Sequence, residues 1–261
     1  MSVTLGGNIL VTGTNRGIGL DLVRYLAEKT NEETRIYACC RDPEGDKAQA
    51  LRDLAIQHPQ KIQLIKLDQS NEDSISCAFQ TVSAHIGAGG LNLLINNAAI
   101  AKPPIPGLLS DTNKQDMMEG YETNVVGPFL LTKVSLSPSS QWKFTQQTQM
   151  ISCRRSAVIN ISTLGSSIEK LPENFHAAQL YSYRASKAAL NMVTRCFSEE
   201  FKSQHILVAA VHPGWVRTDM GGEQATITTQ ESVLGMINLI SSMSNKDRGM
   251  LLDWEGTIIP W

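Results

Sequence analysis

A glycine-rich turn near the N-terminus constrains the fold of this chain more than any other feature. The apolar run from Ile9 to Val11 ends in T-G-T-N-R-G-I-G, and a helical pattern, L-D-L-V-R-Y-L-A-E-K, follows at once. Such a turn aims free N–H groups and the dipole of the helix N-terminus at one point, which favours a phosphate. Gly13, Gly17 and Gly19 would let the backbone approach a pyrophosphate closely. We therefore expect a dinucleotide site; an ordinary strand–helix connection is the alternative.

Short apolar strands then alternate with amphipathic helices along the chain, and no solenoid repeat or Pro/Ser linker interrupts them. This alternation is typical of a parallel sheet that is covered by helices on both faces. We predict one α/β domain over residues 1–261 with about seven strands. The six further strands are expected at Arg35–Cys40, Ile62–Leu67, Leu91–Ile95, Ala157–Ile161, Ile206–Val211 and Met250–Trp254. Helices are expected at Lys47–Gln57, Ser74–His85, Met117–Lys133, from Tyr183 onward and at Glu231–Ser242.

Two stretches show neither helical nor strand periodicity in their apolar residues. From Val134 to Ser156 the chain carries Pro138 and many hydroxylated residues, so we expect a helix to break near Pro138 and an irregular, mobile surface segment to follow. Residues 167–180 are expected to form a loop that reaches the helix containing Tyr183.

Composition excludes several classes of function. The net charge is −2 without a basic cluster, which argues against a nucleic-acid surface. Apolar stretches such as Leu91–Ala101 are far shorter than the roughly 20 residues that span a bilayer, and no basic flank marks a signal peptide. Five cysteines form no C-x-x-C spacing, which favours a reduced, cytoplasmic setting. Adjacent Cys39 and Cys40 should be small core residues. No spacing suggests a metal site.

Tyr183 and Lys187 stand four residues apart in Y-R-A-S-K. Residues four apart share a helix face, about 5–6 Å between Cβ atoms, so the phenol and the ammonium would point into the same space. A neighbouring cation favours the phenolate and would bring its pKa nearer to neutral pH. We expect a proton donor or acceptor here. The alternative is a half-buried tyrosine beside a solvated lysine.

The second strand is followed by Arg41, where many NAD-binding folds place an acidic residue on the ribose 2′-hydroxyl. An arginine there suits a 2′-phosphate, and Arg16 adds a second cation on the same side, which favours NADP over NAD. Two solvated arginines are the alternative. The fourth strand runs into N-N-A-A, and Asn124 stands among apolar neighbours, where a buried amide without partners would cost about 1–3 kcal/mol.

Six motifs occur in order: T-G-T-N-R-G-I-G, N-N-A-A, N-V-V-G, N-I-S-T, Y-R-A-S-K and P-G-W-V-R-T. Together they resemble the short-chain dehydrogenase/reductase family over essentially the whole chain, and most closely its sniffer-like, C-factor-related carbonyl reductases. The resemblance implies a doubly wound Rossmann domain that binds NADP (NADPH) and reduces a small-molecule carbonyl substrate. It implies a proton donor at Tyr183, a ribose-binding Lys187 that lowers the tyrosine pKa, and an Asn124 that holds a water leading to solvent. The cofactor-binding positions that it implies are Gly13, Asn15, Arg16, Gly17, Ile18, Gly19, Arg41, Asp68, Gln69, Asn97, Ala98, Ala99, Tyr183, Lys187, Pro213, Gly214, Val216 and Thr218.

Departures from the family pattern leave some points open. The hydroxyl that steadies the substrate carbonyl falls on Thr163 by register, and Ser162 is the alternative. Ala99 replaces a usual glycine, and the degraded segment after Pro138 leaves a monomer or a homodimer equally open. The loops at 101–113, 164–180 and 217–230 would shape an unidentified substrate pocket. The competing functions are an NADP-binding sensor or signalling module without turnover, and an NAD-linked alcohol dehydrogenase.

Overall fold

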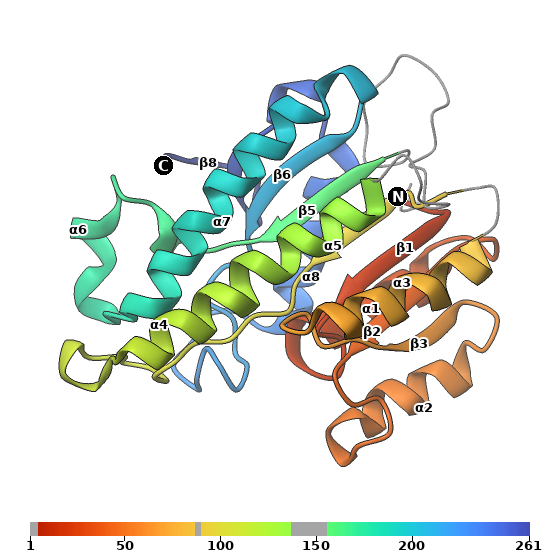
Figure 1. The fold of residues 1–261 in the computed structure, drawn as a ribbon, viewed down its shortest axis with the longest axis horizontal. Coiled ribbons are helices and arrows are strands. Elements are labelled where there is room, and N and C mark those ends of the chain that lie inside the picture. The colour runs from red at the N-terminus through yellow and green to blue at the C-terminus, as the bar shows by residue number, and fades with distance from the viewer. Residues whose placement is uncertain (1–4, 87–89, 137–155) are drawn as a thin grey trace.

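A computed structural model describes residues 5–86, 90–136 and 156–261, and an eight-stranded sheet runs through it (Figure 1). The strands are β1 Asn8–Thr12, β2 Arg35–Cys40, β3 Ile62–Lys66, β4 Leu93–Asn96, β5 Ala157–Ile161, β6 Leu207–His212, β7 Leu251–Asp253 and β8 Ile258–Ile259. Their order is β3-β2-β1-β4-β5-β6-β7-β8. Neighbouring strands pair in parallel from β3 to β7, and β8 pairs antiparallel with β7. The direction of winding therefore reverses between β1 and β4, where a doubly wound sheet opens a crevice at its carboxyl ends.

Helices cover both faces of this sheet. They are α1 Gly17–Lys29, α2 Gln49–Gln57, α3 Glu72–Ile86, α4 Lys114–Tyr121, α5 Gly127–Leu136, α6 Leu171–Asn174, α7 Tyr181–Glu200 and α8 Thr229–Ser242, with a π-helical segment at Glu122–Val126. Single 3₁₀ turns lie at Asp46–Ala48, Leu109–Asp111, Leu164–Ser166, Phe175–Ala177, Lys202–Gln204 and Asn245–Asp247.

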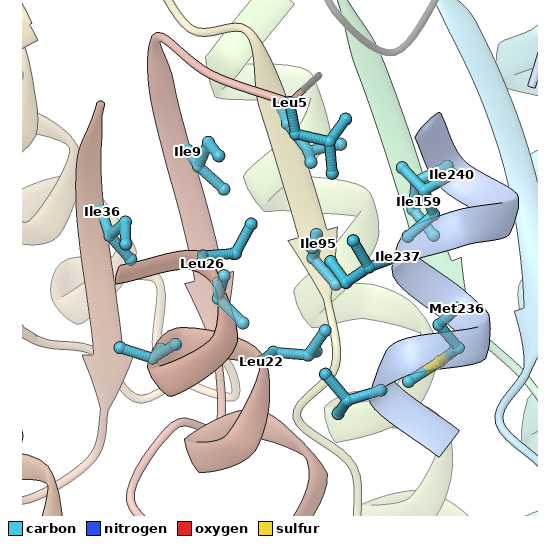
Figure 2. Close-up of a cluster of buried hydrophobic side chains, with 14 of the residues drawn as sticks. Leu5, Ile9, Leu22, Leu26, Ile36, Ile95, Ile159, Met236, Ile237 and Ile240 are labelled. Carbon is cyan, nitrogen blue, oxygen red and sulfur yellow. The ribbon is translucent and has the colours of Figure 1, made fainter. Parts of the chain in front are cut away.

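The strands read as continuous apolar runs because both of their faces are buried. Alternate residues enter two different cores: Ile9 and Val11 face one cluster, whereas Leu10 faces the other. Figure 2 shows the first cluster, in which strand residues Ile9, Ile36, Ile95 and Ile159 meet side chains of α1 and α8. Burying an aliphatic side chain contributes about 1.5–3 kcal/mol, so these two clusters hold the strand ends rigidly in place.

Several expectations are confirmed and several need correction. The α/β class and all seven predicted strands are confirmed, but the sheet has an eighth strand, because β8 is too short to show a period. The expected loop at 167–180 contains α6, which begins with a proline, and a 3₁₀ turn. The long helix expected at 117–133 is helical throughout, yet it changes to π geometry at 122–126.

The irregular segment expected at 134–156 lies mostly outside the described residues, and positions 134–136 still belong to α5. Cys39 and Cys40 are free and buried in the core, as predicted. Within the described ranges no helix is long and apolar enough to cross a membrane, and no group of His, Cys, Asp and Glu side chains could hold a metal ion.

Candidate active site

A cavity of about 530 Å³ lies where the strands end, within the size range of small-molecule sites. Segments that follow β1, β2, β3, β4 and β6 form its wall, and α7 contributes Tyr183 and Lys187. Most of the expected cofactor residues line it: Gly13, Asn15, Arg16, Gly17, Ile18, Gly19, Arg41, Asp68, Gln69, Asn97, Ala98, Ala99, Tyr183, Lys187, Pro213 and Thr218.

Five expected residues do not line this cavity. Gly214 and Val216 are not lining residues, and Val216 is buried and pairs through its backbone with Ile227. Asn124, Ser162 and Thr163 also stand outside it.

Sequence reasoning missed part of the wall. Most of the missed residues adjoin predicted ones, and Arg217, Asp219, Met220 and Thr229 lie in the loop at 217–230, which was expected at a substrate pocket but not named residue by residue. The further lining residues are Thr12, Leu20, Asp21, Cys40, Leu67, Ser70, Ile100, Thr123, Ile161, Arg217, Asp219, Met220 and Thr229.

The glycine turn has the geometry of a phosphate cradle. Gly13 has a φ of +69°, and a Cβ on it would lie 2.8 Å from the Cα of Ala98. A Cβ on Gly19 would lie 2.1 Å from the carbonyl oxygen of Gly13. Helix α1 begins at Gly17, and the side chain of its N-cap residue, Arg16, forms no capping hydrogen bond. The backbone N–H groups of the first turn are therefore directed at the cavity without a side-chain cap, which suits an anion.

The two expected phosphate-binding arginines differ in their surroundings. Arg41 lies at the cavity wall with an exposed side chain. Arg16 forms an exposed ion pair with Asp219, a residue of the loop that follows β6. That both arginines bind a 2′-phosphate stays a prediction, and Arg16 would have to exchange its exposed ion pair with Asp219 to do so.

Amides fix the neighbouring strand ends. The side-chain amide of Asn97 donates to the carbonyl oxygens of Thr12 and Gly13 at 2.8 and 3.2 Å. Gln69 donates to the carbonyl oxygens of Ala98 and Thr123 at 2.9 and 2.7 Å. These bonds tie the turn, the end of β4 and the π-helical segment into one frame around the cavity.

Tyr183 and Lys187 share the inner face of α7, and the lysine is only 2% exposed. Its Nζ donates to the carbonyl oxygen of Ile161 at 2.6 Å and lies 5.8 Å from the centroid of the Tyr183 ring. Burial lowers the pKa of Lys187 to about 7 and raises the pKa of Tyr183 to about 12. The alternative of a solvated lysine is therefore wrong. The lowered tyrosine pKa expected from the neighbouring lysine is not found in this structure, because burial raises the pKa of Tyr183.

Asn124 lies fully buried in the π-helical segment. Its Oδ1 accepts from the N–H of Ile100, and its Nδ2 donates to the carbonyl oxygen of Ile100 and to the Oγ of Ser186, all at 2.9–3.0 Å. The side chain is thus committed to the protein. In π geometry a carbonyl accepts from the residue five positions on, which for Thr123 is Pro128, without an N–H, and for Asn124 is Phe129. The water expected at Asn124 stays a prediction.

The two candidate hydroxyls at the end of β5 have different environments. The Oγ of Ser162 is buried, donates to Oδ1 of Asn191 at 2.6 Å and lies 3.2 Å from the Oγ of Ser166. Thr163 is less buried, and its Oγ1 accepts from the N–H of Gly165 at 3.2 Å, which leaves the hydroxyl proton available for donation. Thr163 therefore has the free hydroxyl proton, although neither residue lines the cavity, and its role as the donor stays a prediction.

Comparisons with known proteins agree with this arrangement. The profile of the family described as short chain dehydrogenase matches residues 7–228. The crystal structure of an NADPH-bound carbonyl reductase from chicken fatty liver is 40% identical and superposes with a TM-score of 0.89, covering 98% of this chain and 100% of that one. The carbonyl reductase Sniffer of D. melanogaster is 31% identical with a TM-score of 0.85 and the same coverage. C-signal of Myxococcus xanthus is 31% identical over 186 residues, which are 70% of this chain and 100% of that protein.

Proposed function

Because this chain belongs to the short-chain dehydrogenase family of oxidoreductases, we propose that it reduces the carbonyl group of a small molecule with NADPH. The observation that carries the proposal is the pairing of a phosphate cradle with Tyr183 and the buried Lys187 in one cavity. The carbonyl reductases among its structural relatives, one of them bound to NADPH, support the same choice.

The residues present fit NADPH. The cradle formed by Gly13, Gly17 and the uncapped start of α1 would hold the pyrophosphate, and Arg41 would pair with the 2′-phosphate that distinguishes NADPH from NADH. When it is bound, NADPH supplies the hydride for the carbonyl carbon. The protein supplies orientation and the proton.

Tyr183 is suited to donate that proton. The phenol is protonated at neutral pH, so the group can act as an acid toward an oxygen that gains negative charge. The Thr163 hydroxyl would stabilise the same oxygen by a second hydrogen bond, as electrostatic stabilisation of the transition state requires.

Lys187 and Asn124 would return a proton to the spent phenolate. With a pKa of about 7, Lys187 both holds and releases a proton near neutral pH. Asn124, whose side chain is bonded to Ser186 of the same helix as Lys187, would hold a water that links Lys187 to solvent.

The test is turnover by the purified protein. We expect consumption of NADPH against a panel of aldehydes, quinones and diketones. Replacing Tyr183→Phe should lower kcat about 10²–10⁴-fold, the usual contribution of a general acid, while the affinity for NADPH stays unchanged.

Two results would contradict the proposal. Tight NADPH binding without turnover of any panel member would favour a binding module that senses the cofactor. Turnover that Tyr183→Phe leaves intact would show that another group donates the proton.

A further inference from the structure

Arg184 directly follows the proton donor Tyr183, and none of the roles above uses it. All five of its N–H groups are engaged by one segment of chain. Nε donates to the carbonyl oxygen of Ala178 at 3.1 Å, and Nη2 donates to the carbonyl oxygens of Ala178 and Asn174 at 2.7 and 3.0 Å. Nη1 donates to the carbonyl oxygen of Gly165 at 3.2 Å and to Oδ1 of Asn174 at 2.5 Å. A planar guanidinium with five fixed donors is the side chain that can hold three positions of a loop at once.

The segment that Arg184 holds is the connection between the two hydroxyls of the site, from Thr163 to Tyr183. This connection contains α6 and two 3₁₀ turns, and surface connections are more mobile than the elements they join unless they are anchored. Arg184 fixes this one near its start, at its middle and near its end. Its guanidinium also lies over the ring of Phe175, 6.0 Å from the centroid, and burial lowers its pKa, so the clamp is partly shielded from water.

The end of the connection is also strained. Leu180, which immediately precedes α7, has a φ of +43° and a ψ of +48°, a left-handed conformation that is unfavourable for a non-glycine residue. Its carbonyl accepts from the backbone N–H of Arg184, and its own N–H donates to the carbonyl of Pro106. Strain of this kind persists only where the surroundings enforce it, and here it lies three residues before Tyr183.

We propose that Arg184 is a positioning residue: its guanidinium ties the connection to the helix that carries Tyr183 and so holds the hydroxyls of Thr163 and Tyr183 at the separation that one carbonyl oxygen requires. The inference rests on the proposed carbonyl reduction. Neither Arg184 nor the residues of its clamp line the cavity that holds Tyr183 and Lys187.

The test compares Arg184→Lys with the control Arg248→Lys in the full-length protein. Lysine keeps the charge but cannot span Gly165, Asn174 and Ala178 together. Arg248 is also a buried arginine against α7, but it contacts the far end of that helix, through the carbonyl of Ser198 at 3.0 Å. For each variant, kcat, KM, the Kd of NADPH and the unfolding temperature are measured.

We expect Arg184→Lys to lower kcat about 10- to 100-fold through misplacement of the donors, with the Kd of NADPH unchanged. Arg248→Lys should lower the unfolding temperature to a similar degree and leave kcat unchanged. Asn174→Ala removes one side-chain acceptor of the clamp without altering α7 and should lower kcat by a smaller factor. If Arg184→Lys does not fold, Asn174→Ala alone tests the positioning role.

If the wild-type protein turns over, two results would overturn the positioning role of Arg184. One is an equal effect of Arg184→Lys and Arg248→Lys on kcat, and the other is an unchanged kcat in Asn174→Ala. Absence of turnover in the wild-type protein would overturn the proposed function and this role with it.

Discussion

Ser162 and Thr163 are neighbours at the end of β5, yet their hydroxyls serve different purposes. Ser162 belongs to a buried network with Asn191 and Ser166, in which every member depends on the others for a partner. Thr163 caps the 3₁₀ turn at Leu164–Ser166 and keeps its proton available. Adjacent strand residues point to opposite sides, so only one of the two can face a substrate.

Substitution of each hydroxyl should therefore separate stability from catalysis. Thr163→Ala should lower kcat about 10²–10³-fold, the usual effect of one lost hydrogen-bond donor to a developing oxyanion, with little change in the unfolding free energy. Ser162→Ala should leave kcat nearly unchanged and lower the unfolding free energy by about 1–3 kcal/mol, because Asn191 loses its buried partner. Urea unfolding and steady-state kinetics of both variants check this, and the reverse pattern would assign the donor to Ser162.

The lowered pKa of Lys187 predicts that the unfolding free energy depends on pH. Its pKa is about 7 in the folded protein against 10.5 in an exposed side chain, so the unfolded chain binds more protons between these values. The unfolding free energy should therefore rise from pH 7 to pH 9, by at most about 1.4 kcal/mol per pH unit. His212, whose pKa is lowered from 6.5, affects only the lower edge of this window, whereas Cys39 and Cys40, whose pKa values are raised from 9.0, oppose the effect of Lys187 as the pH approaches 9.

Urea unfolding at pH 7, 8 and 9 measures this slope. Lys187→Met should flatten it, whereas Lys66→Met, at an exposed lysine of β3, should preserve it. A slope that persists in Lys187→Met would assign the effect to another group.

At the scale of elements, the π-helical segment between α4 and α5 shapes the site most. Such segments inside helices occur frequently at functional sites, because the extra residue per turn releases carbonyl groups. Here the carbonyl of Thr123 accepts from Gln69, and Asn124 reaches across to the backbone of Ile100. Gly127 ends the segment where the helix passes close to Gln69, and this approach requires the absence of a side chain.

Gly127→Ala should therefore disturb both the helix and the cavity. The added Cβ would lie 2.5 Å from the carbonyl oxygen of Gln69 and 2.9 Å from its Cβ, so the backbone must shift. Overpacking of this kind costs about 1–3 kcal/mol, and the displaced Gln69 should also weaken NADPH binding. Gly6→Ala is the control, because its Cβ would meet only ordinary contacts of 3.5 Å or more. Equal unfolding temperatures for the two variants would refute the expected clash.

The sequence predicts the regular elements of this fold well, and their physical basis explains which ones it misses. Strands that are buried on both faces carry uninterrupted apolar runs, and α8 has Thr228 and Glu231 as a capping box. Strand β8 and helix α6 have two and four residues, too few for a period to show. The π-helical segment leaves the helical pattern intact, because one inserted residue changes hydrogen bonding more than it changes hydrophobic spacing.

At the scale of the whole molecule, the sequence predicts the cavity because parallel strands bring their carboxyl ends to one edge. Residues near 13, 41, 97 and 213 converge there although they lie far apart in the chain. Burial and long-range contacts could not be predicted from the sequence. Burial raises the pKa of Tyr183, where a lowered value was expected, and Arg16 pairs with Asp219, which lies 203 residues away in the chain. Arg184 was missed for the same reason, since its loop partners show no spacing signal.

Thermal unfolding of the whole domain offers a direct measure of cofactor choice. A ligand at 100 times its Kd stabilises the folded state by about 2.7 kcal/mol, which corresponds to roughly 5–10 °C for a domain of this size. NADPH should therefore raise the unfolding temperature well above the value with NADH at the same concentration, because Arg41 can pair with the 2′-phosphate.

Arg41→Asp should remove that difference. It replaces a charge-assisted contact of about 1.5–3 kcal/mol by repulsion between a carboxylate and the phosphate, so the two cofactors should stabilise the variant alike. Arg35→Asp is the matched control, because Arg35 lies exposed at the opposite end of the same strand and bonds only to nearby backbone carbonyls among the described residues. If Arg41→Asp keeps the full preference for NADPH, the 2′-phosphate is held elsewhere, and Arg16 must then leave Asp219 to hold it.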